Sequence, residues 1–181
     1  GRFHVAKFGS ASFEIMIWDK ILRVSAFTVL LGSVGCLPEV EYPDEPVVDF
    51  LSFDVGPAGD AVLSFNVTDG DGDLGLDPDD IEPPFCPSCE HYYNLKCEYD
   101  ELRDGVWTHI ELNPNEGQVP FYYRVPRAVP SGTNAAINGV VEIAMNTWSL
   151  QSDYDTLRFR ITIEDRSLNV SNEDTTSFIL K

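Results

Sequence analysis

The residues best suited to chemistry lie in the acidic run Asp69-Gly70-Asp71-Gly72-Asp73. Its three carboxylates repel one another, and at ~4 Å and an effective dielectric of about 20 each pair costs on the order of 4 kcal/mol. The glycines let the backbone fold back so that the side chains converge. Carboxylates and backbone carbonyls are the oxygen ligands that Ca²⁺ takes in proteins. The run therefore predicts a calcium loop, and a plain Asp-Gly turn on an acidic surface is the alternative.

The run fits the twelve-residue calcium loop of an EF-hand only in part. The ligand positions of that loop fall on Asp69, Asp71, Asp73, Gly75, Asp77 and Asp80. Leu74, however, stands where an EF-hand needs glycine for its sharp turn. A strand pattern precedes the loop and Pro78, Pro83 and Pro84 follow it, so flanking helices are not expected. We expect an acidic loop without helices.

A second polar segment, residues 164–172, follows the most regular strand pattern of the chain, residues 157–163. In a seven-stranded sandwich, the loop after the second strand and the loop after the sixth lie at the same end. If residues 63–68 and 157–163 are those strands, the second segment approaches the acidic run. We therefore predict one weak two-loop Ca²⁺ site with the ligands Asp69, Asp71, Asp73, Asp77, Asp165 and Asn169.

The fold class expected from the rest of the pattern is all-β. Residues 63–68 alternate apolar and polar side chains, and 12 prolines with 13 glycines would interrupt most helices. Strands are expected over residues 48–55, 63–68, 91–99, 106–112, 120–125, 140–145, 157–163 and 175–180, with a hairpin about residues 103–105. This pattern predicts an antiparallel immunoglobulin-like or cadherin-like β-sandwich of seven to eight strands, and a jelly roll or small barrel is the alternative.

Residues 16–36 have the features of a secretory signal. Lys20 and Arg23 precede a short apolar run and a small-residue segment that ends at Gly35-Cys36. The run is too short for a membrane-spanning helix, which needs ~20 apolar residues. Gly35-Cys36 resembles a bacterial lipobox, in which the cysteine is lipidated, although Ser33 stands where that pattern has an aliphatic residue. We expect lipidation at Cys36, with ordinary secretion as the alternative.

The ten residues after Cys36 contain three prolines and four acidic side chains. Such a composition forms a stiff, solvated tether rather than packed structure. The chain is therefore expected to divide into a leader or signal peptide (1–35), a lipidated N-terminus and tether (36–46) and a β-sandwich domain (47–181).

The formal charge of the chain is −18 at pH 7. A surface of this sign repels nucleic acid and anionic lipid and concentrates cations. Nucleic acid is therefore excluded as a partner, and contact with a membrane is expected through the lipid on Cys36.

Lipidation of Cys36 leaves three cysteines, Cys86, Cys89 and Cys97. In an oxidising compartment, three cysteines allow one disulfide and one free thiol. On paper they also form a Cys₃His zinc set with His91, because Cys-x-x-Cys is a good half-site. The spacing of His91 and Cys97 is not one of the standard zinc spacings. A disulfide, a zinc site and free thiols all remain open.

Several segments together resemble uncharacterised lipoproteins of the Bacteroidota type. They are the lipobox-like Cys36, the tether that begins Tyr42-Pro43, residues 68–76, Tyr93-Asn94-Leu95, residues 123–126 and residues 165–172. The resemblance implies a protein of the cell envelope that is anchored to the outer membrane and faces the periplasm or the medium. It implies no established activity.

Three functions remain open on this basis. The first is a calcium-stabilised, non-catalytic binding or adhesion module with a protein or glycan partner. The second is a structural accessory subunit of an outer-membrane assembly. The third is an enzyme acting on glycans, although the chain has no Gly-x-Ser-x-Gly, His-Glu-x-x-His or phosphate-loop motif.

Overall fold

Nine strands form in the part of the chain that the computed structural model describes, residues 41–113, 115, 117–129 and 136–181. They are β1 (Val47–Val55), β2 (Ala61–Asp69), β3 (Leu95–Arg103), β4 (Val106–His109), β5 (Tyr122–Tyr123), β6 (Ile137–Met145), β7 (Thr156–Ile163), β8 (Asp174–Thr175) and β9 (Ile179–Leu180). The expected leader and Cys36 lie outside the described residues. Within the described residues, no helix is long and apolar enough to cross a membrane.

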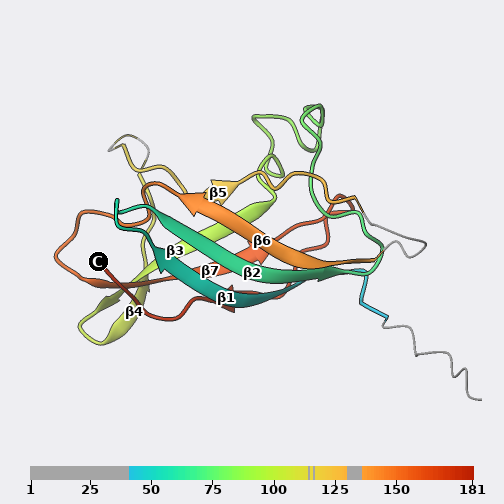
Figure 1. Cartoon of the computed structure of the whole chain (residues 1–181). Coiled ribbons are helices and arrows are strands. Elements are labelled where there is room, and N and C mark those ends of the chain that lie inside the picture. Colours follow the sequence, from blue (N-terminus) through green and yellow to red (C-terminus); the bar gives the residue numbers. More distant parts are fainter. Residues whose placement is uncertain (1–40, 114, 116, 130–135) are drawn as a thin grey trace, which may run out of the picture. The chain divides into compact units, whose positions relative to one another are not determined.

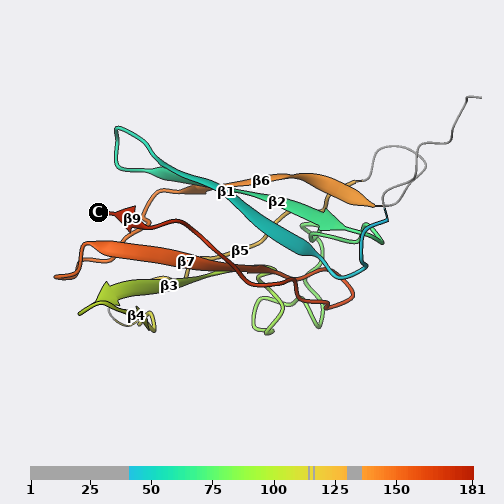
Figure 2. The same ribbon diagram turned by 90° about the horizontal axis from the view of Figure 1, so that it is seen from below.

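The strands form two antiparallel sheets that face each other as the layers of a sandwich, as Figures 1 and 2 show. One sheet has the order β1-β2-β6. The other has the order β4-β3-β7-β8, with β5 paired to β3 and β9 paired to β7. The expected all-β, immunoglobulin-like sandwich is therefore confirmed. The described residues form nine strands instead of seven or eight, because the expected last strand forms two short strands, β8 and β9.

Strict alternation explains why β2 and β7 lie at the centre of their sheets. Leu63, Phe65 and Val67 of β2 point into the sandwich and are at most 2% exposed, and Phe159 and Ile161 of β7 are fully buried opposite them. Burying such a side chain stabilises the fold by roughly 1.5–3 kcal/mol. Because the side-chain period of a strand is two, this burial also fixes the register of both strands.

The hairpin between β3 and β4 turns at Asp104 and Gly105, which have φ values of 51° and 81°. Two successive residues with positive φ are the mark of the tight hairpin turn that Asp-Gly favours. The expected hairpin is thus confirmed, but its first strand begins at Leu95 rather than at residue 91. The expected strand over residues 175–180 is also interrupted, because it pairs with β7 only at its two ends, β8 and β9.

Residues 41–46, expected as part of a solvated tether, pack against the domain instead. The backbone N–H of Gly70 donates a hydrogen bond to the carbonyl of Pro43 (2.8 Å), and Pro46 is buried. The amide of Asn138 donates to the Tyr42 hydroxyl (2.6 Å). Proline and charge content alone did not predict this contact, which depends on the missing side chain at Gly70.

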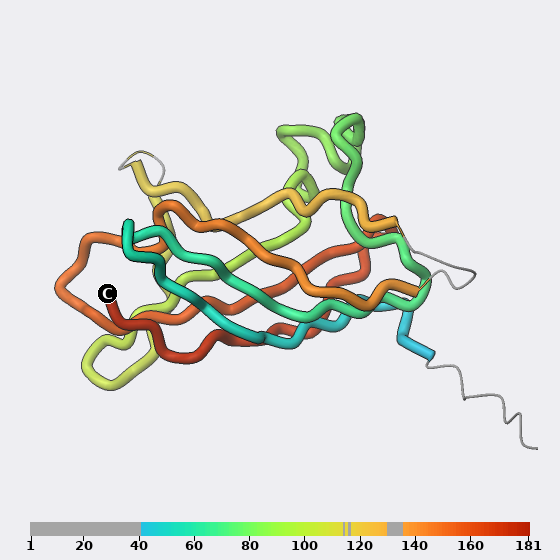
Figure 3. The backbone as a smooth tube through the Cα atoms, in the orientation of Figure 1, coloured from blue at the N-terminus to red at the C-terminus, as the bar shows by residue number. Residues whose placement is uncertain are grey.

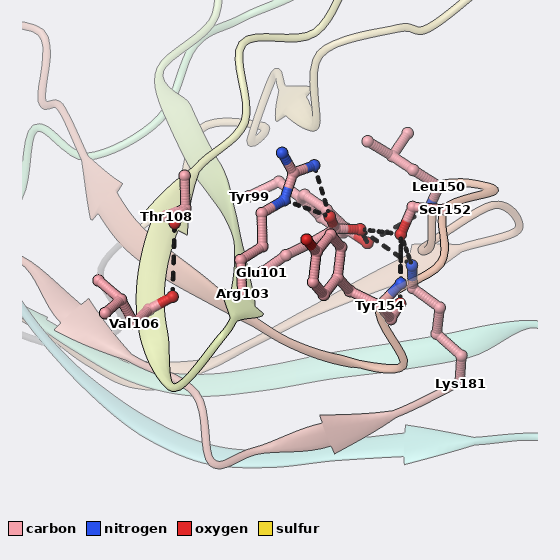
Figure 4. Close-up of polar contacts among 9 residues, drawn as sticks. All are labelled: Tyr99, Glu101, Arg103, Val106, Thr108, Leu150, Ser152, Tyr154 and Lys181. Carbon is pink, nitrogen blue, oxygen red and sulfur yellow. Dashed lines mark hydrogen bonds and ion pairs between the residues drawn. The ribbon is translucent and has the colours of Figure 1, made fainter.

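A buried carboxylate, that of Glu101 on β3, ties the end of the chain to the sandwich (Figure 4). Arg103 donates to one of its oxygens (2.8 and 3.1 Å), and Ser152 (2.6 Å), Lys181 (3.0 Å) and the Tyr99 hydroxyl (3.3 Å) donate to the other. Burial raises the pKa of Glu101, but the hydrogen bonds from Ser152, Arg103 and Lys181 outweigh burial and hold the pKa below its usual range. The network is therefore a structural ion cluster with a charged carboxylate.

We predict that Glu101→Ala lowers the free energy of unfolding by about 3 kcal/mol, because it leaves the two cationic partners without their buried counter-charge. Urea unfolding followed by tryptophan fluorescence measures this. The exposed Glu111 provides the matched control, since Glu111→Ala is expected to change stability by less than about 0.5 kcal/mol. Equal effects of the two substitutions would contradict the structural role of Glu101.

Candidate metal centre

The candidate site lies where β2 and β7 end, at one end of the sandwich. Asp69 is the last residue of β2, and Asp165 comes two residues after the end of β7. Leu74 and Asp165 form an isolated antiparallel bridge, which joins the loop after β2 to the loop after β7. Figure 3 shows the two loops, green and red-orange, side by side at this end. The expected convergence of the two loops is therefore present in the fold.

Four carboxylates meet at this point. Asp69, Asp71, Asp73 and Asp165 each offer one oxygen, and these oxygens all lie within 4.8 Å of one another. Asp69 and Asp165 are buried, Asp73 is half-buried and Asp71 is exposed. At such separations, and with an effective dielectric of about 20, each pair of negative charges costs roughly 3 kcal/mol. The group could therefore hold a metal ion, which would offset this repulsion.

Two of the oxygens lack any hydrogen-bond partner among the described residues. Asp69 has one carboxylate oxygen, Oδ2, that accepts the N–H of Leu74 (2.9 Å), while its Oδ1 is buried and unpaired. Asp73 Oδ2 accepts the Ser167 hydroxyl (2.7 Å), while its Oδ1 is also buried and unpaired. A buried acceptor without a partner costs about 1–3 kcal/mol, more when it is charged. These two oxygens are free to act as ligands.

Burial and charge act together on the carboxylate of Asp69. The pKa of Asp69 is raised to about 7, mainly by burial and then by the negative charge of Asp71. The charges of Asp73 and Asp165 raise it further, whereas the hydrogen bond from the N–H of Leu74 lowers it. Burial, with smaller contributions from Asp73 and Asp71, also raises the pKa of Asp165, although Asn169 acts in the opposite direction. Without a cation, Asp69 therefore keeps its proton to a higher pH than an ordinary carboxyl does.

Asn169 holds Asp165 in place. Its backbone N–H donates to Asp165 Oδ1 (2.8 Å) and its side-chain amide donates to Oδ2 (2.8 Å). The backbone N–H of Asp165 in turn donates to the carbonyl of Asn169 (3.1 Å). The loop after β7 is thus closed on itself around the Asp165 carboxylate. The structure shows Asn169 as a residue that orients Asp165.

Asp77 and Asp80 lie outside the four-carboxylate group. The Asp77 carboxylate pairs with Arg127 (3.2 Å) and stands 3.9 Å from Arg166. Asp80 makes a two-pronged ion pair with Arg166, and this contact, as the largest cause, lowers the pKa of Asp80. The alignment to a calcium loop placed both residues among the ligands because it counted positions and could not see two arginines from elsewhere in the chain.

Arg124 also organises the segment between β2 and β3, and its role could not be predicted from its neighbours in sequence. Its guanidinium donates to the carbonyls of Asp77 (3.0 Å), Asp80 (2.6 Å) and Tyr92 (2.9 Å). These carbonyls belong to a segment with little regular structure, so the arginine replaces the strand partners that they lack. Arg124 and Arg166 together hold the segment between β2 and β3 in place beside the metal centre.

The three described cysteines do not come together in one site. Cys86 and Cys89 form a disulfide, whereas Cys97 is a buried free thiol on β3, where burial raises its pKa. His91 Nδ1 lies 2.7 Å from Glu164 Oε1. The structure therefore pairs the Cys-x-x-Cys residues and does not assemble the alternative zinc set of three cysteines with His91.

Comparison of the chain with models of protein families, with curated proteins and with solved structures found no match.

We predict that Asp69 makes the metal-free protein less stable as the pH rises. Because the pKa of Asp69 is raised from 3.8 to about 7, the folded protein keeps a proton that the unfolded chain has released in this window. Stability contributed by the protonated form is therefore lost between pH 4 and about 7, with an upper bound of roughly 4 kcal/mol. Urea unfolding in EDTA across this pH range measures the slope.

Asp69→Asn is the matched test, because an amide keeps an acceptor for Leu74 and cannot ionise. In EDTA at pH 7.5 we expect this variant to be more stable than the wild type by about 1–3 kcal/mol, with a flatter pH profile. The exposed Asp79→Asn serves as the control and should leave the profile unchanged. A variant that is destabilised in EDTA at every pH would show that the carboxylate is needed for the fold itself.

Proposed function

We propose that this protein is a calcium-stabilised, non-catalytic binding module of the cell envelope. The observation that carries the proposal is the pair of unpaired, buried oxygens of Asp69 and Asp73 inside a group of four carboxylates. A simple turn does not require buried carboxylate oxygens without partners, and burying them costs free energy. A divalent cation supplies the missing partner.

Calcium suits this group better than other cations. All four side chains offer oxygen, which favours a hard cation over zinc or copper. Ligands on opposite sides of Ca²⁺ stand ~4.8 Å apart, because each bond is ~2.4 Å, whereas Mg²⁺ requires ~4.2 Å. The four oxygens lie within 4.8 Å of one another, a separation that Ca²⁺ can bridge. Asp69, Asp71, Asp73 and Asp165 would hold the ion, and water would complete its coordination.

The proposed role of the ion is to stiffen the loops at one end of the sandwich. Asp69, Asp71 and Asp73 belong to the loop after β2, and Asp165 belongs to the loop after β7, so one ion would join both sheets. The segment between β2 and β3, which Arg124 and Arg166 hold in place, continues from the loop after β2. Loops held on a rigid β-scaffold are the usual place for binding residues. The partner is a protein or a glycan.

The proposed location in the cell envelope rests on two features. The Cys86–Cys89 disulfide is typical of an oxidising compartment outside the cytoplasm. The lipobox-like segment that ends at Cys36 supports a lipid anchor at the outer membrane.

This anchor can be tested by expressing the chain in a Gram-negative host that is grown with an alkyne-labelled palmitate. Label should enter the wild type and not Cys36→Ser; equal labelling of both would contradict it.

We predict that Ca²⁺ stabilises the domain. At a free concentration fifty times the dissociation constant, binding adds about 2 kcal/mol, which raises the melting temperature by roughly 5–10 °C. Asp71→Asn combined with Asp73→Asn should remove this shift and the calorimetric heat of binding. Asp79→Asn is the control with the same chemistry at an exposed position outside the group. The absence of any calcium-dependent shift in the wild type would refute the proposal, and an equal shift with magnesium would refute the choice of ion.

A further inference from the structure

The acidic loop has a second contact that the proposed calcium role does not use, because the start of the domain docks on it. Gly70 lies between two of the metal-site aspartates, and its N–H donates to the Pro43 carbonyl (2.8 Å). A Cβ atom at position 70 would lie 2.3 Å from the Tyr42 carbonyl oxygen and 2.6 Å from that of Pro43. Only glycine allows this approach.

The φ angle of Gly70 lies outside the left-handed region, unlike that of Gly72, whose φ is 72°. The backbone at position 70 would therefore accept an alanine, and the docked segment is the obstacle to a side chain. Glycine at this position is thus explained by the contact with residues 42 and 43 rather than by the shape of the loop.

A second hydrogen bond, from strand β6, holds the same segment. The Asn138 amide of β6 donates to the Tyr42 hydroxyl (2.6 Å). Asn138 lies opposite Thr68 of β2, one residue before Asp69. Directly before the chain enters β1, the segment therefore contacts both the acidic loop after β2 (residues 69–73, the metal loop) and the start of β6.

We propose that the metal loop is a calcium-dependent docking site for residues 41–46, so that Ca²⁺ decides whether the segment leading into the domain is clamped or free. The inference rests on the proposed calcium binding. Repulsion among the four carboxylates works against the loop conformation in which the N–H of Gly70 donates to the Pro43 carbonyl. A bound cation fixes Asp69 and Asp71 on either side of Gly70 and so presents that N–H in one position.

Linkage makes the inference quantitative. If Ca²⁺ strengthens docking by some factor, docking must strengthen Ca²⁺ binding by the same factor. Residues 41–46 would then be held against the domain in calcium and released without it. The consequence for an anchored protein is that the cation sets how far and how freely the domain stands from its anchor.

The test uses the full chain and two readouts. The first is the dissociation constant for CaCl₂ by calorimetry. The second is the rate at which a glutamate-specific protease cuts after Glu41, followed by mass spectrometry in EDTA and in saturating calcium. In the wild type, we expect calcium to slow this cut about fivefold or more, which is the lower range of typical coupling between sites.

Three variants separate docking from metal binding. Gly70→Ala should expel the segment, so that the cut after Glu41 stays fast even in saturating calcium and the dissociation constant rises about fivefold. Asn138→Ala, which lies outside the loop, should shift both readouts in the same direction by less. Gly139→Ala is the control, because its Cβ would meet nothing within 4 Å and its φ is ordinary; both readouts should match the wild type.

The outcomes distinguish the two proposals. If the wild type binds calcium but the cut after Glu41 is equally fast with and without it, the docking inference is wrong and the proposed function stands. The same conclusion follows if Gly70→Ala and Asn138→Ala both bind calcium as the wild type does. If the wild type binds no calcium, both proposals fail together.

Discussion

The constraint on which this structure depends is the repulsion among four carboxylates at the end of two strands. Asp69 and Asp165 are placed by the strict alternation of β2 and β7, whose buried faces fix the register and thus the exit point of each strand. The sandwich therefore forces together groups that repel one another. The energy for this comes from the apolar contacts between the sheets, where the fully buried side chains of both strands meet.

The polar groups around the four carboxylates orient them but do not neutralise their charge. Leu74, Ser167 and Asn169 donate hydrogen bonds that orient three of the carboxylates, but none of these groups carries a positive charge. The nearby cation, Arg166, is held by Asp80 instead. A buried carboxylate is stable when a cation pairs with it. Glu101 is an example, because an arginine and a lysine contact its buried side chain. No lysine or arginine in the described part of the chain makes an ion pair with the four loop carboxylates, and this difference from Glu101 is why we propose a metal site there.

The sequence allowed the strands to be predicted where alternation is strict, and it allowed the convergence of two loops to be derived from a sandwich with seven strands. Other features depend on contacts between distant positions. Asp77 and Asp80 have the right spacing for ligands, but Arg127 and Arg166 engage them, and no local pattern indicates that. Residues 41–46 have the composition of a solvated tether, and their docking follows from a glycine about 25 residues away. Tertiary contacts decided both cases, whereas local propensity decided the strands.

The most direct test of calcium binding by the four carboxylates is a crystal structure of the protein grown in calcium, with anomalous diffraction used to locate the ion. We predict one calcium ion ~2.4 Å from the unpaired Oδ1 atoms of Asp69 and Asp73, with Asp71, Asp165 and water around it. A site that holds only water at saturating calcium, or one in which a basic side chain fills the space between the carboxylates, would contradict it.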